Sequence, residues 1–195
     1  MEYWNKRNAD RTPAASSDYN KGRHKYLRSL ITRTGGTVLK LDLWNEGGSK
    51  GCFDIGLFKA FDVIGMDIAE VACAKAKAEN PWMNLLNLTV EFLPYRDRSM
   101  DVILDISTSD HVPFGAFRRL IRDYARILKG QGELLMIFNN RLLGTPRMTG
   151  FADYWFTEQE VRETISQYFN IKILKPYGTH PNELKHYLLK AVKKW

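Results

Sequence analysis

The stretch VIGMDIAEVACAKAKA, residues 63–78, runs from a short, mostly apolar segment through one acidic residue into an alanine-rich segment. Short apolar runs suit buried β-strands, and alanine favours helices. The stretch therefore predicts a strand over 63–66 and a helix over 68–79, with Asp67 at the point where the strand ends.

The same alternation extends to both sides of this stretch. The other expected strands cover 37–43, 85–92, 102–106 and 133–138, and the other expected helices cover 24–33, 53–61 and 114–128. Strands that alternate with helices of this length indicate βαβ units and a parallel sheet.

The last forty residues or so break the alternation. Thr157 and Glu160 have the spacing of a capping box, which predicts a helix that runs to about Tyr168. Two further strands are expected over 171–174 and 186–192, and their spacing permits an antiparallel pair. The expected fold is therefore α/β: a three-layer αβα sandwich whose seven-stranded sheet is mostly parallel, with an antiparallel C-terminal strand pair.

The composition predicts one globular domain. The chain has 195 residues, of which 44% are hydrophobic and 26% charged. Residues 1–22 are expected to form a loose arm, so we divide the chain into an N-terminal arm and helix, 1–34, and a main domain, 35–195. No apolar run approaches the roughly 20 residues that span a bilayer, so a membrane partner is not expected.

Cysteine usage and the N-terminal residues favour the cytoplasm. The first 25 residues are polar and contain no apolar core of a secretory signal. Cys52 and Cys73 form no CxxC pair and have no histidine at metal-ligand spacing. We therefore expect a cytoplasmic protein with two buried or half-buried thiols and no metal site.

The net charge of +7 favours anionic partners in general. The lysines and arginines are spread along the chain, however, and the densest cluster lies in 185–194. This cluster has two interpretations: the solvated outer face of a last strand, or a surface for a nucleic acid or an anionic substrate.

Acidic and hydroxyl side chains follow the expected strands. In an open parallel sheet, ligands bind outside the carboxyl ends of the strands. Asp42, Asn45 and Glu46 follow the first strand, Asp67 ends the second, and 105–111 follow the fourth. None of these residues is a lysine. The carboxyl ends of the strands therefore suit a cofactor with a ribose, an amine and a cationic centre better than they suit a bare phosphate group.

Asp67 is the most informative single residue. A carboxylate at the end of the second strand can accept hydrogen bonds from both hydroxyls of a ribose. The alternative is a purely structural role, because Asp67 and Glu70 also have the spacing of a capping box at the start of the following helix.

Residues 37–138 resemble the class I, Rossmann-like methyltransferases that depend on S-adenosylmethionine. VIGMDIAEVACAKAKA resembles their second motif, and LPYRDRSMDVILDISTSDHV resembles the LPF-x-D-x-SFD turn and fourth strand. YARILKGQGELLMI is similar to their RVLKPGG helix end and fifth strand. The resemblance implies S-adenosylmethionine as the cofactor.

The first motif departs from the family. Where the family has a glycine-rich D-x-G-x-G-x-G, residues 40–46 read KLDLWNE, and glycines follow only at 47 and 48. The stretch looks like a subgroup with K-T-D-L-F-x-E at this place and S-T-x-D-H after the fourth strand. We therefore identify the chain as a member with a degenerate, glycine-poor first motif.

By this resemblance Asp42, Asn45 and Glu46 serve the amino acid end of the cofactor, and Thr89 and Val90 lie where the family contacts adenine. Structural roles for Asp42 and Glu46, as loop acids, remain the alternative. The full set of implied cofactor contacts is Leu41, Asp42, Asn45, Glu46, Asp67, Ile68, Thr89, Val90, Asp105, Ile106 and Ser107.

His111 is the one histidine near the expected site, and it is our candidate for a base or substrate contact. The alternative is a histidine that packs locally at a helix start. Residues 139–155, with basic and aromatic side chains, are expected to shape the acceptor pocket. Tyr3 and Trp4 either fold over the cofactor as a lid or simply pack against the domain.

Three functions remain open at this point. The first is methyl transfer to a small-molecule acceptor, which we expect. The second is an RNA methyltransferase, as the positive charge suggests. The third is a non-catalytic protein that uses the methyltransferase fold for interactions, because the first motif has lost its glycines. A nucleotide-dependent dehydrogenase is disfavoured, since no G-x-G-x-x-G follows the first strand.

Overall fold

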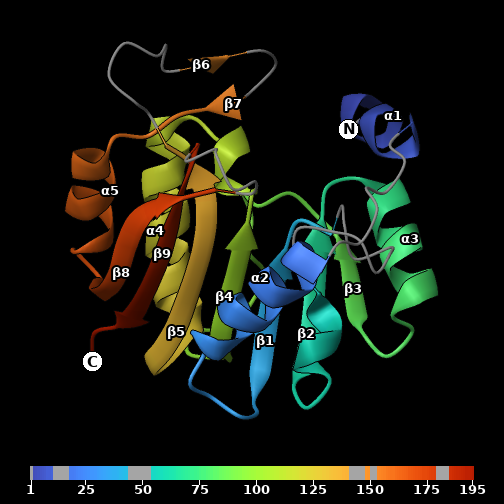
Figure 1. Cartoon of the computed structure of the whole chain (residues 1–195), viewed down its shortest axis with the longest axis horizontal. Coiled ribbons are helices and arrows are strands. Elements are labelled where there is room, and N and C mark those ends of the chain that lie inside the picture. The colour runs from blue at the N-terminus through green and yellow to red at the C-terminus, as the bar shows by residue number, and fades with distance from the viewer. Residues whose placement is uncertain (1, 11–17, 44–53, 141–147, 150–152, 179–184) are drawn as a thin grey trace. The chain divides into compact units, whose positions relative to one another are not determined.

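The computed structural model describes residues 2–10, 18–43, 54–140, 148–149, 153–178 and 185–195, and in this part of the chain seven strands form one mixed sheet (Figure 1). The order is β3 (Asn84–Asn87), β2 (Asp62–Asp67), β1 (Thr37–Leu41), β4 (Met100–Ile106), β5 (Leu128–Asn139), β9 (His186–Lys193) and β8 (Phe169–Tyr177). Strands β1, β2 and β3 are parallel to one another, as are β4 and β5, whereas β9 is antiparallel to both β5 and β8. The expected fold class is confirmed.

The chain folds as two compact units, Met1–Leu93 and Pro94–Trp195. In the first unit, α3 (Glu70–Glu79) packs against β2 and β3. Its buried residues are the small Ala72 and Ala76, which let the helix approach the strands closely. The expected division at residue 34 stays a prediction.

The N-terminal residues differ from the expected loose arm. Residues Glu2–Asp10 form α1 and Asp18–Ser29 form α2, so the expectation was wrong for most of 1–22. Helix α1 lies against α3, where the Asn5 side-chain oxygen accepts a hydrogen bond of 3.4 Å from the backbone N–H of Val71 (Figure 1). A short polar helix of this kind depends on such tertiary contacts, which the local sequence pattern does not report.

The second unit is built on a deeply buried strand. Every residue of β4 is buried, and α4 (Phe114–Ile127) and α5 (Glu158–Ile165) pack against each other. An aromatic cluster joins α4, β5 and Phe156, which lies two residues before α5. The ring centroids of Phe117 and Phe156 are 4.6 Å apart and those of Phe138 and Phe156 are 6.0 Å apart. The Thr157–Glu160 capping box that begins α5 is confirmed.

Three local expectations need correction. The third strand covers only Asn84–Asn87, because the chain turns away after Leu88 and Thr89 accepts the N–H of Phe92. The expected helix over 53–61 is a single 3₁₀ turn, η1 (Ile55–Phe58), and residue 53 lies outside the described residues. A small hairpin of β6 (Met148–Thr149) and β7 (Asp153–Tyr154) was not expected at all.

None of the helices in the described ranges has the length and apolar character that crossing a membrane requires.

Candidate functional site

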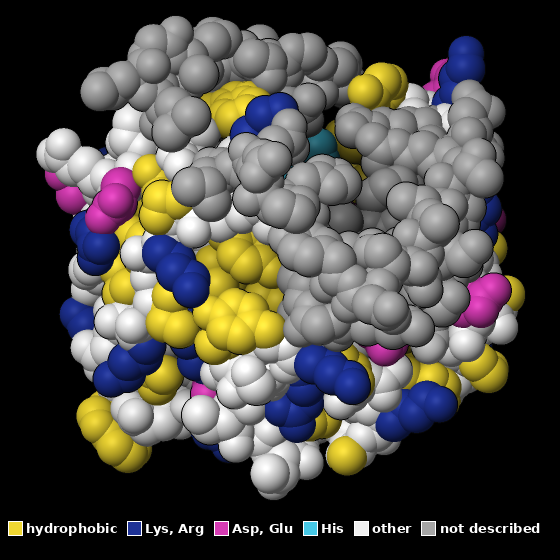
Figure 2. All heavy atoms as spheres, in the orientation of Figure 1, with side chains coloured by type: hydrophobic (Ala, Val, Ile, Leu, Met, Phe, Trp, Pro, Cys, Tyr) yellow, Lys and Arg dark blue, Asp and Glu magenta, His cyan; other side chains and the backbone are white. Residues whose placement is uncertain are grey.

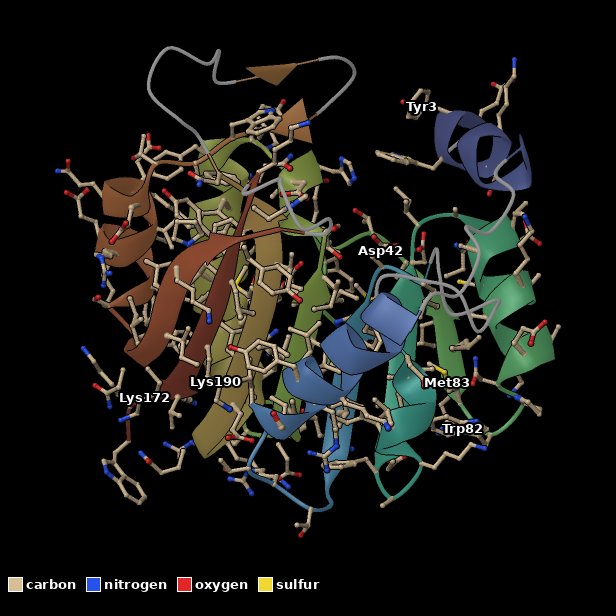
Figure 3. The ribbon with its side chains drawn as sticks, in the orientation of Figure 1. Tyr3, Asp42, Trp82, Met83, Lys172 and Lys190 are labelled. Atoms are coloured by element: carbon tan, nitrogen blue, oxygen red, sulfur yellow. The ribbon has the colours of Figure 1, made fainter. Side chains whose placement is uncertain are left out.

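The end of β1 turns through an unusual backbone conformation. Asp42 has a φ of 63°, in the left-handed region, which Asp tolerates better than most residues other than glycine. Its N–H donates to the carbonyl of Met66 at 3.1 Å. Asp42 (Figure 3) thus takes a left-handed conformation at the position where the resemblance implies the first glycine of the motif.

Lys40 supports this turn from within the fold. Its side chain is buried, and its ammonium group donates to the carbonyl of Leu41 at 2.6 Å and to the carbonyl of Asp42. Leu41 is itself fully buried, so any contact of this residue with a ligand would be made by its backbone. The sequence analysis did not single out Lys40 as a site residue.

Asp67 links the ends of β1 and β2. One carboxylate oxygen accepts the N–H of Leu43 at 2.8 Å, and the other accepts the N–H of Ala69 at 2.7 Å. The N-cap residue of α3 is Ala69, which makes no side-chain cap, so a capping box between Asp67 and Glu70 is not formed. The capping box between Asp67 and Glu70 is therefore contradicted, while the choice between a structural and a ribose-binding role for Asp67 stays a prediction.

The carboxyl of Asp67 has its pKa raised to about 6. Burial is the main cause and the nearby charge of Asp42 the second, while the N–H groups of Ala69 and Leu43 and the charge of Lys40 oppose the rise. Among the described residues, each oxygen accepts one hydrogen bond from a backbone N–H, which leaves a second lone pair on each that can accept a ribose hydroxyl. The residues present thus fit the ribose of the implied cofactor.

The side chain of Asn87, the last residue of β3, binds the main chain at the end of β2. Its amide donates to the carbonyls of Asp67 and Ile68 at 3.0 and 2.9 Å. The N–H of Leu88 also donates to the Asp67 carbonyl, at 3.1 Å, so Thr89 and Val90 follow directly beyond the end of β2. The hydroxyl of Thr89 accepts the N–H of Glu91 at 3.3 Å. The sequence did not indicate Asn87 as a site residue, because the expected third strand ran to residue 92, whereas β3 ends at Asn87.

In the second unit, Asp105 holds the turn after β4. Its carboxylate is fully buried and accepts from the N–H groups of Thr108 and Ser109, at 3.1 and 3.2 Å, and from the hydroxyls of Ser109 and Tyr124. Burial raises the pKa of Asp105, and these donors oppose the rise. The side chain is committed to the turn, so contact with a cofactor would come from the backbone of Asp105, Ile106 or Ser107.

Ser107 gives this turn its shape. It has a φ of 69°, and its N–H donates to the carbonyl of Ile137 at 2.9 Å. Ser107 and Asp42 are thus both left-handed residues directly after a strand of their own unit. Ile106 is buried at the end of β4.

His111 ends a 3₁₀ turn, η2 (Ser109–His111), that buried carboxylates hold on both sides. Asp105 holds the start of η2, and Asp110, also buried, accepts the N–H of Asn139 at the end of β5. His111 itself is half-buried and its N–H donates to the carbonyl of Thr108 at 3.0 Å. The imidazole is therefore carried on a rigid turn at the end of β4.

Part of the expected acceptor segment lies beside this turn. The Asn139 amide donates to the carbonyl of Tyr154 at 3.3 Å, and β7 is in contact with η2. Tyr154 and Trp155 are half-buried. Residues 141–147 and 150–152 lie outside the described residues, as do Asn45 and Glu46 of the implied cofactor contacts.

A further expectation concerns the two aromatic residues near the start of α1. The rings of Tyr3 and Trp4 stack edge to face with centroids 5.0 Å apart, and Tyr3 lies on the side of the first unit where Asp42 follows β1 (Figure 3). The role of the two aromatics as a lid stays a prediction.

Within the described ranges, no cluster of three or more His, Cys, Asp or Glu side chains could hold a metal ion.

The strand order and the polar turns after β1, β2 and β4 are those of class I, Rossmann-like methyltransferases. Residues 45–136 match the family model described as a methyltransferase domain. Residues 45–136 are thus similar to a methyltransferase domain, and S-adenosylmethionine is the cofactor that this similarity implies.

The chain is similar in sequence to a probable S-adenosylmethionine-dependent methyltransferase of Mycobacterium tuberculosis, with 31% identity over 87 residues. This match covers 45% of the chain and 31% of that protein, so the chain spans less than a third of the relative's length.

Two solved structures illustrate the range of the fold. The geranyl diphosphate C-methyltransferase of Streptomyces coelicolor, in a complex with S-adenosyl-L-homocysteine, is 11% identical with a TM-score of 0.70, covering 89% of this chain and 79% of that chain. The [4+2]-cyclase SpnF is 15% identical with a TM-score of 0.74, covering 95% and 85%. At these identities the likeness shows the fold alone.

Proposed function

We propose that the protein is a methyltransferase that binds S-adenosylmethionine through the first unit and transfers its methyl group to a small-molecule acceptor. The observation that carries this proposal is Asp67, a half-buried carboxylate fixed by two backbone N–H groups at the end of β2, inside the stretch that matches the methyltransferase domain. Its two remaining lone pairs suit a vicinal pair of ribose hydroxyls.

Different residues of the chain bind different parts of the cofactor. When bound, the cofactor supplies a methyl group on a sulfonium, which is already a good leaving group. Asp67 holds the ribose, the backbone beside Ile68 and Thr89 borders the base, and the turn at Asp42 faces the amino acid end. The protein must chiefly orient the acceptor and exclude water.

His111 is the proposed base for an acceptor that must lose a proton. Its turn is held by Asp105 and Asp110, so the imidazole has a defined position before any ligand binds. A histidine suits proton transfer near neutral pH. Half-buried Tyr154 and Trp155, in a segment that contacts η2, favour a planar acceptor beside it.

A small acceptor is favoured over RNA by the distribution of charge. On the face shown in Figure 2, the described lysines and arginines stand in separate groups between apolar side chains. An RNA-binding surface would require a continuous basic patch with interleaved aromatics.

Calorimetric titration with S-adenosylhomocysteine tests the cofactor site. Asp67→Ala should weaken binding at least tenfold, because a charged acceptor of two hydrogen bonds is lost. Asp62→Ala, at the exposed start of the same strand, is the matched control and should leave the affinity unchanged. If the wild-type protein does not bind this ligand, the catalytic proposal is abandoned in favour of an interaction protein.

The acceptor class needs a second assay. Methyl transfer from labelled S-adenosylmethionine is measured into a metabolite extract and, separately, into total RNA. We expect label in the metabolites, with the rate reduced 10²–10⁴-fold in His111→Asn while S-adenosylhomocysteine affinity is kept. Label in RNA alone would contradict the proposed acceptor.

A further inference from the structure

Two lysines are buried in the described part of the chain: Lys40, and Lys190, which Figure 3 labels. Lys190 on β9 forms an ion pair with Glu133 on β5. The ammonium group of Lys40, on β1, donates to two main-chain carbonyls, those of Leu41 and Asp42. A buried ammonium group is costly to desolvate, so a well-defined set of acceptors is expected around it.

The two carbonyls that Lys40 binds lie on either side of the backbone dihedrals of Asp42. Holding both carbonyls on one ammonium group fixes the orientation of the two peptide planes and so the left-handed turn between them. A non-glycine residue is disfavoured in this region unless its surroundings hold it there. Lys40 therefore stabilises the left-handed conformation at Asp42, which a glycine adopts without a supporting contact.

This turn is attached directly to the ribose-binding carboxylate. The N–H of Asp42 donates to Met66 of β2, and the N–H of Leu43 donates to Asp67. Lys40, the turn at Asp42 and the carboxylate of Asp67 are thus joined by consecutive hydrogen bonds between side chains and the main chain.

We propose that Lys40 is a positioning residue that takes over the role of the missing first-motif glycines by holding the turn at Asp42, from which the next residue, Leu43, binds Asp67. The cofactor part of this inference rests on the proposed function. The part that concerns Lys40, Asp42 and Asp67 in the free protein does not.

The charges around Asp67 are opposed in sign. Among the described residues, Asp42 raises the pKa of the Asp67 carboxyl and Lys40 lowers it, both from β1. From α3 the thiol of Cys73 faces the Asp67 carbonyl, and from β3 the uncharged amide of Asn87 binds the same carbonyl. Removing one charge at a time should therefore move the titration of Asp67 in opposite directions.

The wild-type protein should lose S-adenosylhomocysteine affinity as the pH falls through about 6, where Asp67 becomes protonated, by up to tenfold per pH unit. Lys40→Met should move this midpoint to higher pH. Asp42→Asn should move it to lower pH, and asparagine also tolerates the left-handed turn. The double variant Lys40→Met/Asp42→Asn should return the midpoint toward that of the wild type.

The experiment combines two readouts. Calorimetry between pH 5 and 8 gives the midpoint for binding, and the amide resonances of Leu43 and Ala69, which donate to Asp67, report its titration without any ligand. His111→Asn is used as the background for both, because histidines titrate in the same range. If Lys40→Met does not fold, Lys40→Met/Asp42→Gly keeps the test available, because glycine needs no support in the left-handed region.

Opposite shifts in the two single variants support the proposal. If Lys40→Met is unfolded, recovery of the fold in Lys40→Met/Asp42→Gly supports it, because glycine adopts the left-handed conformation without a supporting contact, and no recovery overturns it. If the titration midpoint moves in the same direction in both single variants, or moves in neither, the proposal is overturned. If the wild-type protein binds no S-adenosylhomocysteine while the amide titrations still move in opposite directions, the proposed function fails and the role of Lys40 in the free protein stands.

Discussion

The phenol of Tyr124 on α4 donates a hydrogen bond of 2.8 Å to the carboxylate of Asp105 on β4, and both side chains are fully buried. Asp105 in turn holds Ser109 at the start of η2. A helix on one face of the strand thus fixes the turn that carries His111.

Tyr124→Phe should destabilise the protein by about 1.5–3 kcal/mol at neutral pH, since it removes a donor from a buried carboxylate. Burial already raises the pKa of Asp105, and the loss of this donor raises it further, so the cost should shrink at acidic pH where the group is protonated. Urea denaturation at pH 7 and pH 4.5 measures both effects. Tyr168→Phe, at a half-buried tyrosine outside this network, is the control. Equal losses in the two variants would contradict the assignment.

The ion pair between Lys190 and Glu133 joins β9 to β5 in the second unit, and both side chains are about 95% buried or more. Lys190→Met should cost about 3–5 kcal/mol, because it leaves Glu133 buried without its partner. In the double variant Lys190→Met/Glu133→Leu the stability should return to the wild-type value or exceed it. Denaturant unfolding of the three proteins tests this, and a double variant as unstable as the single one would show that the pair has another role.

Two glycines of the second unit should respond in opposite ways to alanine. A Cβ at Gly132 would lie 2.9 Å from the carbonyl oxygen of Lys129 and 2.8 Å from a methyl group of Leu128, whereas a Cβ at Gly115 meets nothing within 4 Å. Gly132→Ala should therefore destabilise the protein by about 1–3 kcal/mol through overpacking. Gly115→Ala, in α4, should stabilise it by up to about 1 kcal/mol. The two thermal unfolding curves should move to opposite sides of the wild-type curve.

The thiol of Cys73 should react slowly with alkylating agents at neutral pH. Burial, and then the charge of Asp67, raise its pKa to about 11, so about one thiol in a hundred is ionised at pH 9. In a Cys52→Ser background, the rate of iodoacetamide labelling should rise about tenfold per pH unit up to that pKa. N-acetylcysteine is the reference, and a rate that levels off near pH 9 would contradict the prediction.

Elements that follow from local pattern were predicted well. The apolar run of β4, the amphipathic spacing of α4 and the Thr157–Glu160 capping box are each encoded within a few residues. The apolar runs also indicated a sheet that is mostly parallel. The α1 helix and the small β6–β7 hairpin were not predicted, since their stability comes from contacts with distant segments.

The sequence by itself determined the fold class, the position of Asp67 at the end of the second strand and the loss of the first-motif glycines, because strand ends and motifs are local properties of the chain. Only the tertiary structure decided how Asp67 is used, with its oxygens on Leu43 and Ala69, and which residues support it. Lys40 and Asn87 were invisible as site residues for the same reason. Their partners are main-chain carbonyls, which every residue carries, so only the folded backbone selects among them.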